Sequence, residues 1–309
     1  MQRITGAPGV IDLTDPEDLP QTLYDRIRPP DFFEVRVRDI SSTAGNVGLL
    51  GLCANYEAGR WRAIEFVDLL FDYLPEFALE YSELDQFHAG TGRRQLRKAA
   101  QMMYASDKYK SRGEFGELLL HAACREIYRS EPAISKIFFK GAVNETVHGF
   151  DSVHVVADGD ALELLLGEVK FYANVSSAMS AVAAELEEHL EADWLRSECM
   201  LISNRLDPAW PHSDRLRELI SERRTLDRVF RSIRAPVLLT YDSACVKGHS
   251  SEDAPYPESF CAELREIHDR FSKRDLPAHV VIDLILVPLL DKSDFVSELD
   301  RKLRIFQQI

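Results

Sequence analysis

Cysteine is scarce in this sequence and follows no metal-binding pattern. The chain has 309 residues and only five cysteines, an odd number, with no Cys-x-x-Cys pair. Its nine histidines include no His-x-x-x-His pair. A disulfide framework and a zinc site of cysteine and histidine are therefore not expected, and the pattern is typical of reduced thiols in an intracellular protein.

Long apolar runs are also missing. No uninterrupted apolar segment approaches the roughly 20 residues that a membrane-spanning helix needs. The opening segment, MQRITGAPGVIDLTDPEDLP, lacks the apolar core of a signal peptide. We therefore expect a cytoplasmic protein without a membrane segment.

Positive charge is in the minority, because 37 lysines and arginines face 51 acidic residues and give a net charge of −14. Broad affinity for nucleic acid is not expected, since it depends on releasing counterions from phosphates. One basic segment, residues 93–112, is the exception, and only Asp107 opposes its charges. A DNA-contacting surface and an ordinary solvated helix with a loop both fit this segment. Its basic residues are Arg93, Arg94, Arg97, Lys98, Lys108, Lys110 and Arg112.

Helical and strand patterns alternate along the chain, which predicts an α/β fold. Residues 113–128 have apolar residues at helical spacing, and the turn ADGD joins two strand-like runs. The expected strands are 32–40, 134–140, 147–157, 162–171, 199–203, 236–246 and 279–290, and the later helices are 176–195, 213–231, 257–271 and 293–307. We divide the chain into a smaller N-terminal lobe, 1–105, with a possible partner or DNA contact, and a domain at 106–309.

An acid and a lysine share one face of a strand that otherwise reads as buried. In LELLLGEVKF, residues 162–171, side chains alternate across the strand, so Glu168 and Lys170 project from the same side. The one other acid-x-lysine pair, Asp300 with Lys302, falls in an expected helix, where residues two apart diverge. Buried charges are costly unless they are paired or bind a metal, so the burial of Glu168 and Lys170 on one strand requires an explanation. An internal ion pair without function is the simpler alternative.

Two further acids fit a metal site beside this pair. Asp151 pairs in register near Glu168 if the turn is centred at about Gly159, so both carboxylates are placed to share a Mg²⁺. Lys170 is then placed to orient a nucleophile or to neutralise charge in the transition state. Glu117, on the preceding helix, is a candidate further ligand, although an acid in a first helical turn also complements the helix dipole.

Helix Glu117, then Asp151, then Glu168-Val169-Lys170 resembles the PD-(D/E)XK nuclease superfamily, over roughly Gly113 to Leu195. GEFGELLLHA, GFD and GEVKFY carry the likeness, and Gly149-Phe150 stands where the motif has its proline. The resemblance implies a restriction-endonuclease-like core, a mixed central sheet flanked by helices. It also implies catalysis by Glu117, Asp151, Glu168 and Lys170. The three acids would hold Mg²⁺, with Mn²⁺ as a possible substitute.

The N-terminal lobe and the run KGAVNETVHGFDSVHV resemble the nuclease-subunit family of the Hachiman anti-phage defence system. That resemblance implies a magnesium-dependent deoxyribonuclease that works on DNA with a superfamily 2 helicase subunit and is restrained until DNA is delivered. Lys140 and His148 are candidate phosphate contacts, whereas His154 reads as a structural histidine. The alternative is a non-catalytic adaptor, a nuclease fold that docks a helicase or DNA.

Overall fold

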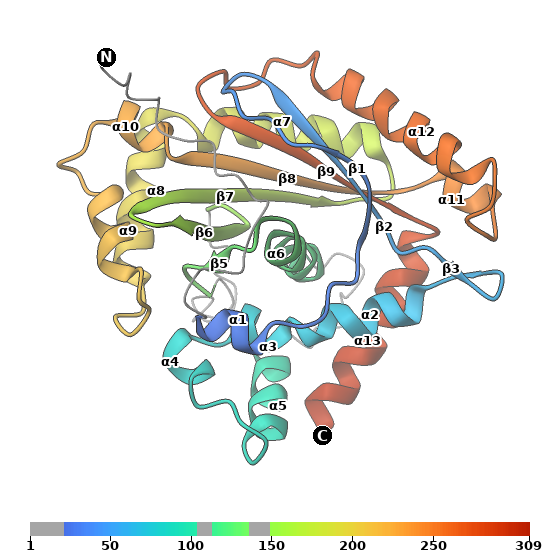
Figure 1. The fold of residues 1–309 in the computed structure, drawn as a ribbon, viewed down its shortest axis with the longest axis horizontal. Helices are drawn as coiled ribbons and strands as arrows, with labels where there is room; N and C mark the ends of the chain where they lie inside the picture. The colour runs from blue at the N-terminus through green and yellow to red at the C-terminus, as the bar shows by residue number, and fades with distance from the viewer. Residues whose placement is uncertain (1–21, 104–112, 136–148) are drawn as a thin grey trace, which may run out of the picture.

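The fold is built on one seven-stranded mixed sheet (Figure 1). The computed structural model describes residues 22–103, 113–135 and 149–309. The strands follow in the order β1 (Glu34–Asp39), β2 (Val47–Cys53), β9 (Val281–Leu289), β8 (Ile233–Asp242), β7 (Ala161–Phe171), β6 (Ser152–Asp158) and β5 (Glu131–Pro132). A separate small hairpin pairs β3 (Tyr56–Glu57) with β4 (Arg60–Trp61).

The centre of the sheet is parallel and its edges are antiparallel. β2, β9, β8 and β7 run parallel, while β1 pairs antiparallel with β2 at one edge and β6 and β5 pair antiparallel at the other. The central strands read as nearly continuous apolar runs because both of their faces are covered. The predicted mixed central sheet flanked by helices is confirmed.

Helices form a layer on each face of the sheet (Figure 1). On one face, α7 (Val175–His189) packs on β7 and β8, and α12 (Tyr256–Phe271) packs on β1 and β2. On the other face, α6 (Glu114–Tyr128) packs on β6 and β7 and is covered in turn by α2 (Ala63–Asp72) and α3 (Leu74–Ala78). The remaining helices are α1 (Leu23–Ile27), α4 (Tyr81–Leu84), α5 (Gly92–Met102), α8 (Ala192–Arg205), α9 (Ser213–Leu219), α10 (Leu226–Phe230), α11 (Ala244–Gly248) and α13 (Lys292–Gln308).

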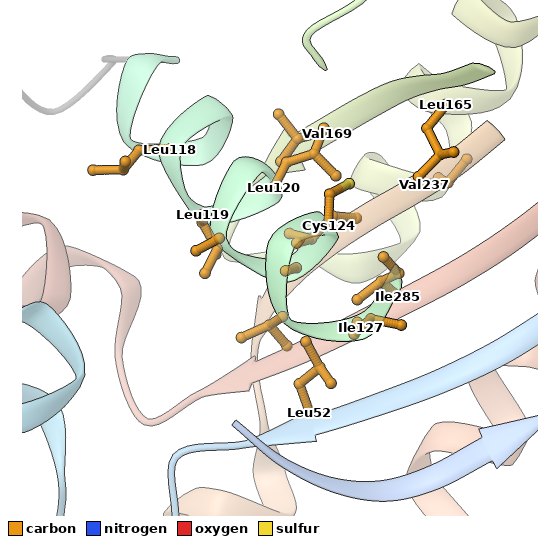
Figure 2. Packing of buried hydrophobic residues seen from close by; sticks show 14 of the residues in the cluster. Leu52, Leu118, Leu119, Leu120, Cys124, Ile127, Leu165, Val169, Val237 and Ile285 are labelled. Carbon is orange, nitrogen blue, oxygen red and sulfur yellow. The ribbon is translucent and has the colours of Figure 1, made fainter. Parts of the chain in front are cut away.

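Helix α6 lies at the centre of the core, and every residue from Phe115 to Tyr128 is buried. Figure 2 shows its apolar side chains packed against those of several sheet strands, with Leu120 beside Val169. The helix approaches the sheet closely at Gly116, where an added Cβ would lie 3.0 Å from the Cβ of Phe171. The polar residues of this helix are enclosed as well, so each needs a partner inside the protein.

The hairpin predicted between the second and third expected strands is confirmed. β6 and β7 pair antiparallel from Asp158 opposite Ala161 to Ser152 opposite Gly167. Gly159 opens the turn with φ of +51°, a conformation that favours glycine. Continued one residue beyond the ladder, this register places Asp151 opposite Glu168.

The strand expected at residues 199–203 is wrong, because this segment belongs to α8. A strand would bury alternate residues, but the buried positions are Leu195, Cys199 and Ile202, at helical spacing. Met200 and Leu201 are exposed instead, at 52% and 42%. The helix expected at 176–195 therefore ends at His189, and a second helix starts at Ala192.

Two other predictions differ in detail. The helix expected at 213–231 is divided into α9 and α10, and the strand expected at 236–246 is β8, which ends at Asp242, so that residues 244–246 belong to α11. Most of the strand expected at 134–140 lies outside the described residues, as do Lys108, Lys110, Arg112, Lys140 and His148.

The first hundred residues contribute β1 and β2 to the same sheet as β7, since β2 pairs parallel with β9. The division of the chain at residue 105 stays a prediction. Among the described residues, no helix has the length and apolar character to cross a membrane.

Candidate active site

Asp151 and Glu168 meet at the end of the β6–β7 hairpin that lies away from the turn. Asp151 directly precedes β6, and its Oδ2 accepts a hydrogen bond of 3.0 Å from the backbone N–H of Val169. Glu168, on β7, is only 1% exposed. Residues opposite each other on antiparallel strands project to the same face, so the hairpin register sets the two carboxylates side by side.

Lys170 extends from the same face of β7 and forms an ion pair with Glu185 of α7. Burial alone would lower the pKa of Lys170. The hydrogen bond and charge of Glu185 act the other way, together with the charges of Asp151 and Glu168, and the pKa is raised above its usual value. The lysine is therefore a cation at neutral pH, surrounded by three carboxylates.

His189, one helical turn after Glu185, makes the matching contact with Glu168. Its Nδ1 lies 2.6 Å from Glu168 Oε1. Burial lowers the pKa of His189 below its usual value, although the charges of Glu185, Glu188 and Asp151 act to raise it. Because a carboxylate only accepts, Nδ1 carries the proton and donates a hydrogen bond to Glu168 Oε1.

Aromatic side chains hold the ring of His189 in place. Trp194 of α8 stacks on it with ring centroids 4.0 Å apart and an interplanar angle of 14°. Phe150, the neighbour of Asp151, packs edge-on against it at 5.5 Å. Phe150 and Trp194 also pack against each other at 5.3 Å, so the three rings form one cluster between β6, α7 and α8.

Glu117 approaches from the opposite face of the sheet. It lies on α6 and is 7% exposed. Gly116, the residue before Glu117, lies against Val169 and Phe171 of β7. The N–H of Val169 donates to Asp151, so Glu117 lies at the same end of the hairpin as Asp151. The structure thus brings Asp151, Glu168 and Lys170 together on one face, and whether Glu117 joins them as a ligand stays a prediction.

The donor set suits Mg²⁺. In the described parts of the chain, no three His, Cys, Asp or Glu side chains converge closely enough to hold a metal on their own. Mg²⁺ does not require such a cage, because it is usually bound by one or two carboxylates, several waters and substrate phosphate. Asp151 and Glu168 supply two such carboxylates, and a cation between them would offset their repulsion.

Gly149 and Phe150 precede β6, and the backbone conformation of Gly149 favours glycine. Its φ is +148°. An added Cβ would also lie 2.7 Å from Glu198 Oε1 of α8. A side chain at this position would therefore have to displace the carboxylate of Glu198.

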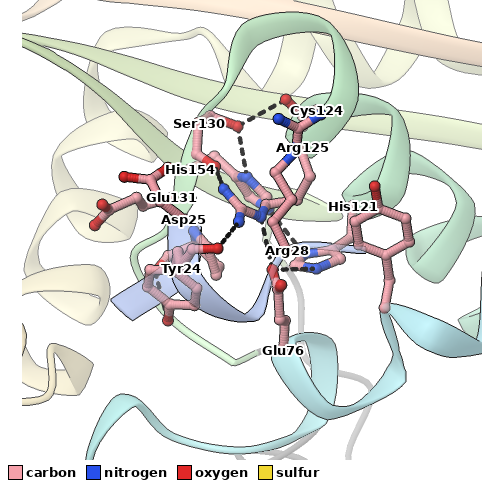
Figure 3. Close-up of polar contacts among 12 residues, drawn as sticks. Tyr24, Asp25, Arg28, Glu76, His121, Cys124, Arg125, Ser130, Glu131 and His154 are labelled. Atoms are coloured by element: carbon pink, nitrogen blue, oxygen red, sulfur yellow. Dashed lines mark hydrogen bonds and ion pairs between the residues drawn. The ribbon is translucent and has the colours of Figure 1, made fainter. Parts of the chain in front are cut away.

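A second polar cluster lies behind the site on the α6 side (Figure 3). Arg125, fully buried, donates to Glu76 Oε2 at 2.6 Å and to the carbonyls of Tyr24 and Ser130. His121 Nδ1 lies 3.1 Å from His154 Nε2, and His154 Nδ1 lies 2.9 Å from Ser130 Oγ. Both nitrogens of His154 have partners, as expected of a structural histidine.

A small cavity separates this cluster from the candidate site. It measures about 20 Å³, room for about one water, and Asp151, Glu76, His121 and His154 are among its lining residues. Glu76 Oε1 and His121 Nε2 have no hydrogen-bond partner within the described part of the protein. Asp151 thus lies between Glu168 and Lys170 on one side and the buried histidines of the second cluster on the other.

The described part of the basic segment lies on α5. Arg93 and Arg94 are exposed, Arg97 is half-buried, and Lys98 forms an ion pair with Glu83. A role for this segment in binding DNA stays a prediction.

Sequence reasoning missed the contributions of α7 and α8. Glu185 and His189 are four residues apart, which places them on one helix face, and this spacing was the available signal. The signal is weak because the helix contains several other acids, so the pattern does not show which of them faces β7. Trp194 and Glu198 had no signal of their own, since their roles depend on how α8 folds back.

One comparison agrees with the resemblance to the Hachiman family. The sequence model of the HamA family matches residues 30–303, almost the whole chain. A search of curated proteins finds no match. The chain therefore belongs to the HamA family, whose members are components of the Hachiman anti-phage defence system.

Proposed function

We propose that this protein is a metal-dependent deoxyribonuclease that cuts DNA by phosphodiester hydrolysis as the effector of its defence system. One observation carries the proposal. The β6–β7 hairpin sets Asp151 opposite Glu168, with Lys170 on the same face of the same strand. This arrangement resembles that of the PD-(D/E)XK motif and supports the proposal, because it lies in a buried position where charges are otherwise costly.

Asp151 and Glu168 would hold Mg²⁺, or Mn²⁺ in its place, with Glu117 as a possible further ligand. When bound, the ion polarises the phosphate and lowers the pKa of a bound water. The raised pKa of Lys170 keeps it protonated, so its role is to stabilise developing negative charge or to orient the attacking water. Lys170 does not act as the general base in this scheme.

The charge of the chain supports delivery of DNA by a partner. With a net charge of −14, the isolated protein has little electrostatic attraction for a duplex. A superfamily 2 helicase subunit that carries the DNA would supply what this chain lacks, and it would also restrain cleavage until DNA arrives. The proposal therefore includes both DNA and a helicase partner.

Plasmid cleavage with and without the helicase subunit tests the proposed activity. In the presence of Mg²⁺, Asp151→Ala and Lys170→Ala should each lower the cleavage rate by about 100-fold or more, the usual cost of losing such a group. EDTA should stop cleavage by the wild type. Thermal unfolding and helicase binding should show that both variants still fold and assemble.

Lys302→Ala is the matched control. Lys302 also follows an acid two residues earlier, but it lies on α13 and pairs with Asp68. This variant should cut DNA at the wild-type rate. If Asp151→Ala and Lys170→Ala also cut at the wild-type rate, the site assignment is wrong. A wild type that binds the helicase but never cuts DNA would favour the adaptor instead.

A further inference from the structure

We propose that His189 is a positioning residue of this site, which fixes the Glu168 carboxylate in the orientation that binds the divalent cation. This inference rests on the proposed function. It adds a residue on α7 that does not belong to the acid-x-lysine motif. The starting observation is the contact of 2.6 Å between His189 Nδ1 and Glu168 Oε1.

The contact is directional. An imidazole that donates a hydrogen bond from Nδ1 binds one carboxylate oxygen along a defined line, so it restricts the rotation of the Glu168 side chain. Carboxylates that bind metals are commonly held by such hydrogen bonds, and loss of the partner typically weakens metal affinity by about 10–100-fold. His189 stands in this relation to Glu168.

The ring of His189 is itself fixed, which a positioning role requires. Trp194 stacks on one side of it, and Phe150 packs edge-on against it. Phe150 is covalently joined to Asp151, so the same aromatic cluster connects both proposed ligand strands to α7.

Glu185 makes the parallel contact one helical turn earlier, with Lys170. Glu185 and His189 thus lie on one face of α7, and this face contacts Lys170 and Glu168 of β7. Of the two contacts, the one to Glu168 has a direct consequence for the metal, because Glu168 is the proposed ligand.

The experiment measures metal binding as well as cleavage. Mn²⁺ binding to the full-length protein without DNA is measured by electron paramagnetic resonance of the free ion, and cleavage is measured over a range of Mg²⁺ concentrations. His189→Leu should weaken Mn²⁺ binding by about 10–100-fold. It should raise the Mg²⁺ concentration for half-maximal cleavage by a similar factor, while cleavage at saturating Mg²⁺ recovers most of the wild-type rate.

Two variants separate positioning from simple packing. His189→Asn keeps a donor near the position of Nδ1 and should recover part of the lost affinity, whereas Trp194→Leu keeps the donor but loosens the ring and should show a smaller loss. His268→Leu is the control. His268 is a half-buried histidine of α12, on the same face of the sheet, and its Nε2 lies 2.9 Å from the carbonyl of Val47. Its loss should leave metal affinity unchanged.

The outcomes distinguish this inference from the proposed function. A wild type that neither binds Mn²⁺ nor cuts DNA would overturn both. If the wild type binds and cuts while His189→Leu has the same metal affinity, the positioning role is wrong and the nuclease proposal stands. A purely structural histidine would lower the unfolding temperature and the cleavage rate at every Mg²⁺ concentration, without a shift in the metal dependence. If His189→Leu does not fold, unaltered metal affinity in both His189→Asn and Trp194→Leu would contradict the inference.

Discussion

At the scale of single residues, two similar patterns have different meanings. Glu168 with Lys170 and Asp300 with Lys302 have the same spacing in the sequence. On β7 the two side chains share one face, and both are buried. On α13 they diverge, and each finds a separate partner, Arg304 for Asp300 and Asp68 for Lys302. The strand context, and not the letters alone, made the first pair predictable as a site.

The position of Asp151 was also predictable, because a short turn fixes the register of every residue in a hairpin. The contacts of Glu168 and Lys170 with α7 were not. His189 and Glu185 reach β7 only because α7 crosses the sheet at one particular angle, and no local pattern encodes that angle. The predicted site therefore had its proposed ligands but lacked the side chains that hold them.

Gly149 gives a prediction at this scale. Gly149→Ala should lower the free energy of unfolding by about 1–3 kcal/mol, because a residue at φ of +148° is strained and its Cβ would press against Glu198. Urea unfolding measures the change. Gly248→Ala, where an added Cβ meets nothing within 4 Å, is the control and should change stability little. Equal stability of the two variants would show that the backbone at Gly149 relaxes without cost.

At the scale of elements, local patterns were sufficient where the partner was near in the sequence. The β6–β7 hairpin was predicted from its turn, and α6 from its apolar spacing. The pairing of β2 with β9 was not predicted, since it joins Val47 to Ile282 across most of the chain. Nothing in either segment alone specifies a parallel neighbour so far away.

Helix α7 begins with a side-chain cap that can be tested apart from the site. The Oδ1 of Asn174 accepts a hydrogen bond of 2.9 Å from the N–H of Ser177. Asn174→Ala should cost about 1 kcal/mol of stability, whereas Asn174→Asp, which retains the oxygen, should cost little. Urea unfolding measures both.

Cleavage should be unaffected by either change at Asn174. The cap lies at the start of α7, while Glu185 and His189 lie in its last turns. A large loss of cleavage in a folded Asn174→Ala protein would mean that the first turn contributes to the site. That result would contradict the assignment of the functional face to the C-terminal half of the helix.

At the scale of the whole molecule, the buried α6 brings polar groups into the centre of the fold. Arg125, Glu76, His121 and His154 lie between the sheet and α3, and all four are at most 2% exposed. Buried ionisable groups link stability to pH whenever folding changes their pKa values. The two histidines give this linkage a definite sign.

Burial lowers the pKa of His154 to about 3 and that of His121 well below its usual value, with the charge of Arg125 acting in the same direction on both. Each ring is therefore neutral in the folded protein down to acidic pH, while in the unfolded chain it takes up a proton below about pH 6.5. The unfolded state then binds more protons than the folded state. The stability that the two neutral histidines contribute is fully present above pH 6.5 and is lost as the pH falls toward 3.

We expect each of these histidines to lower the free energy of unfolding by up to about 1.4 kcal/mol per pH unit between pH 6 and pH 4. Urea unfolding at several pH values measures the slope. The raised pKa of Glu76 acts in the opposite direction at the acidic end, so the comparison that isolates one histidine is with His154→Gln. This variant is less stable at pH 7 but should lose stability less steeply on acidification. Identical slopes for the two proteins would mean that His154 takes up its proton in the folded state. The buried pair of His121 and His154 would then not be neutral at acidic pH.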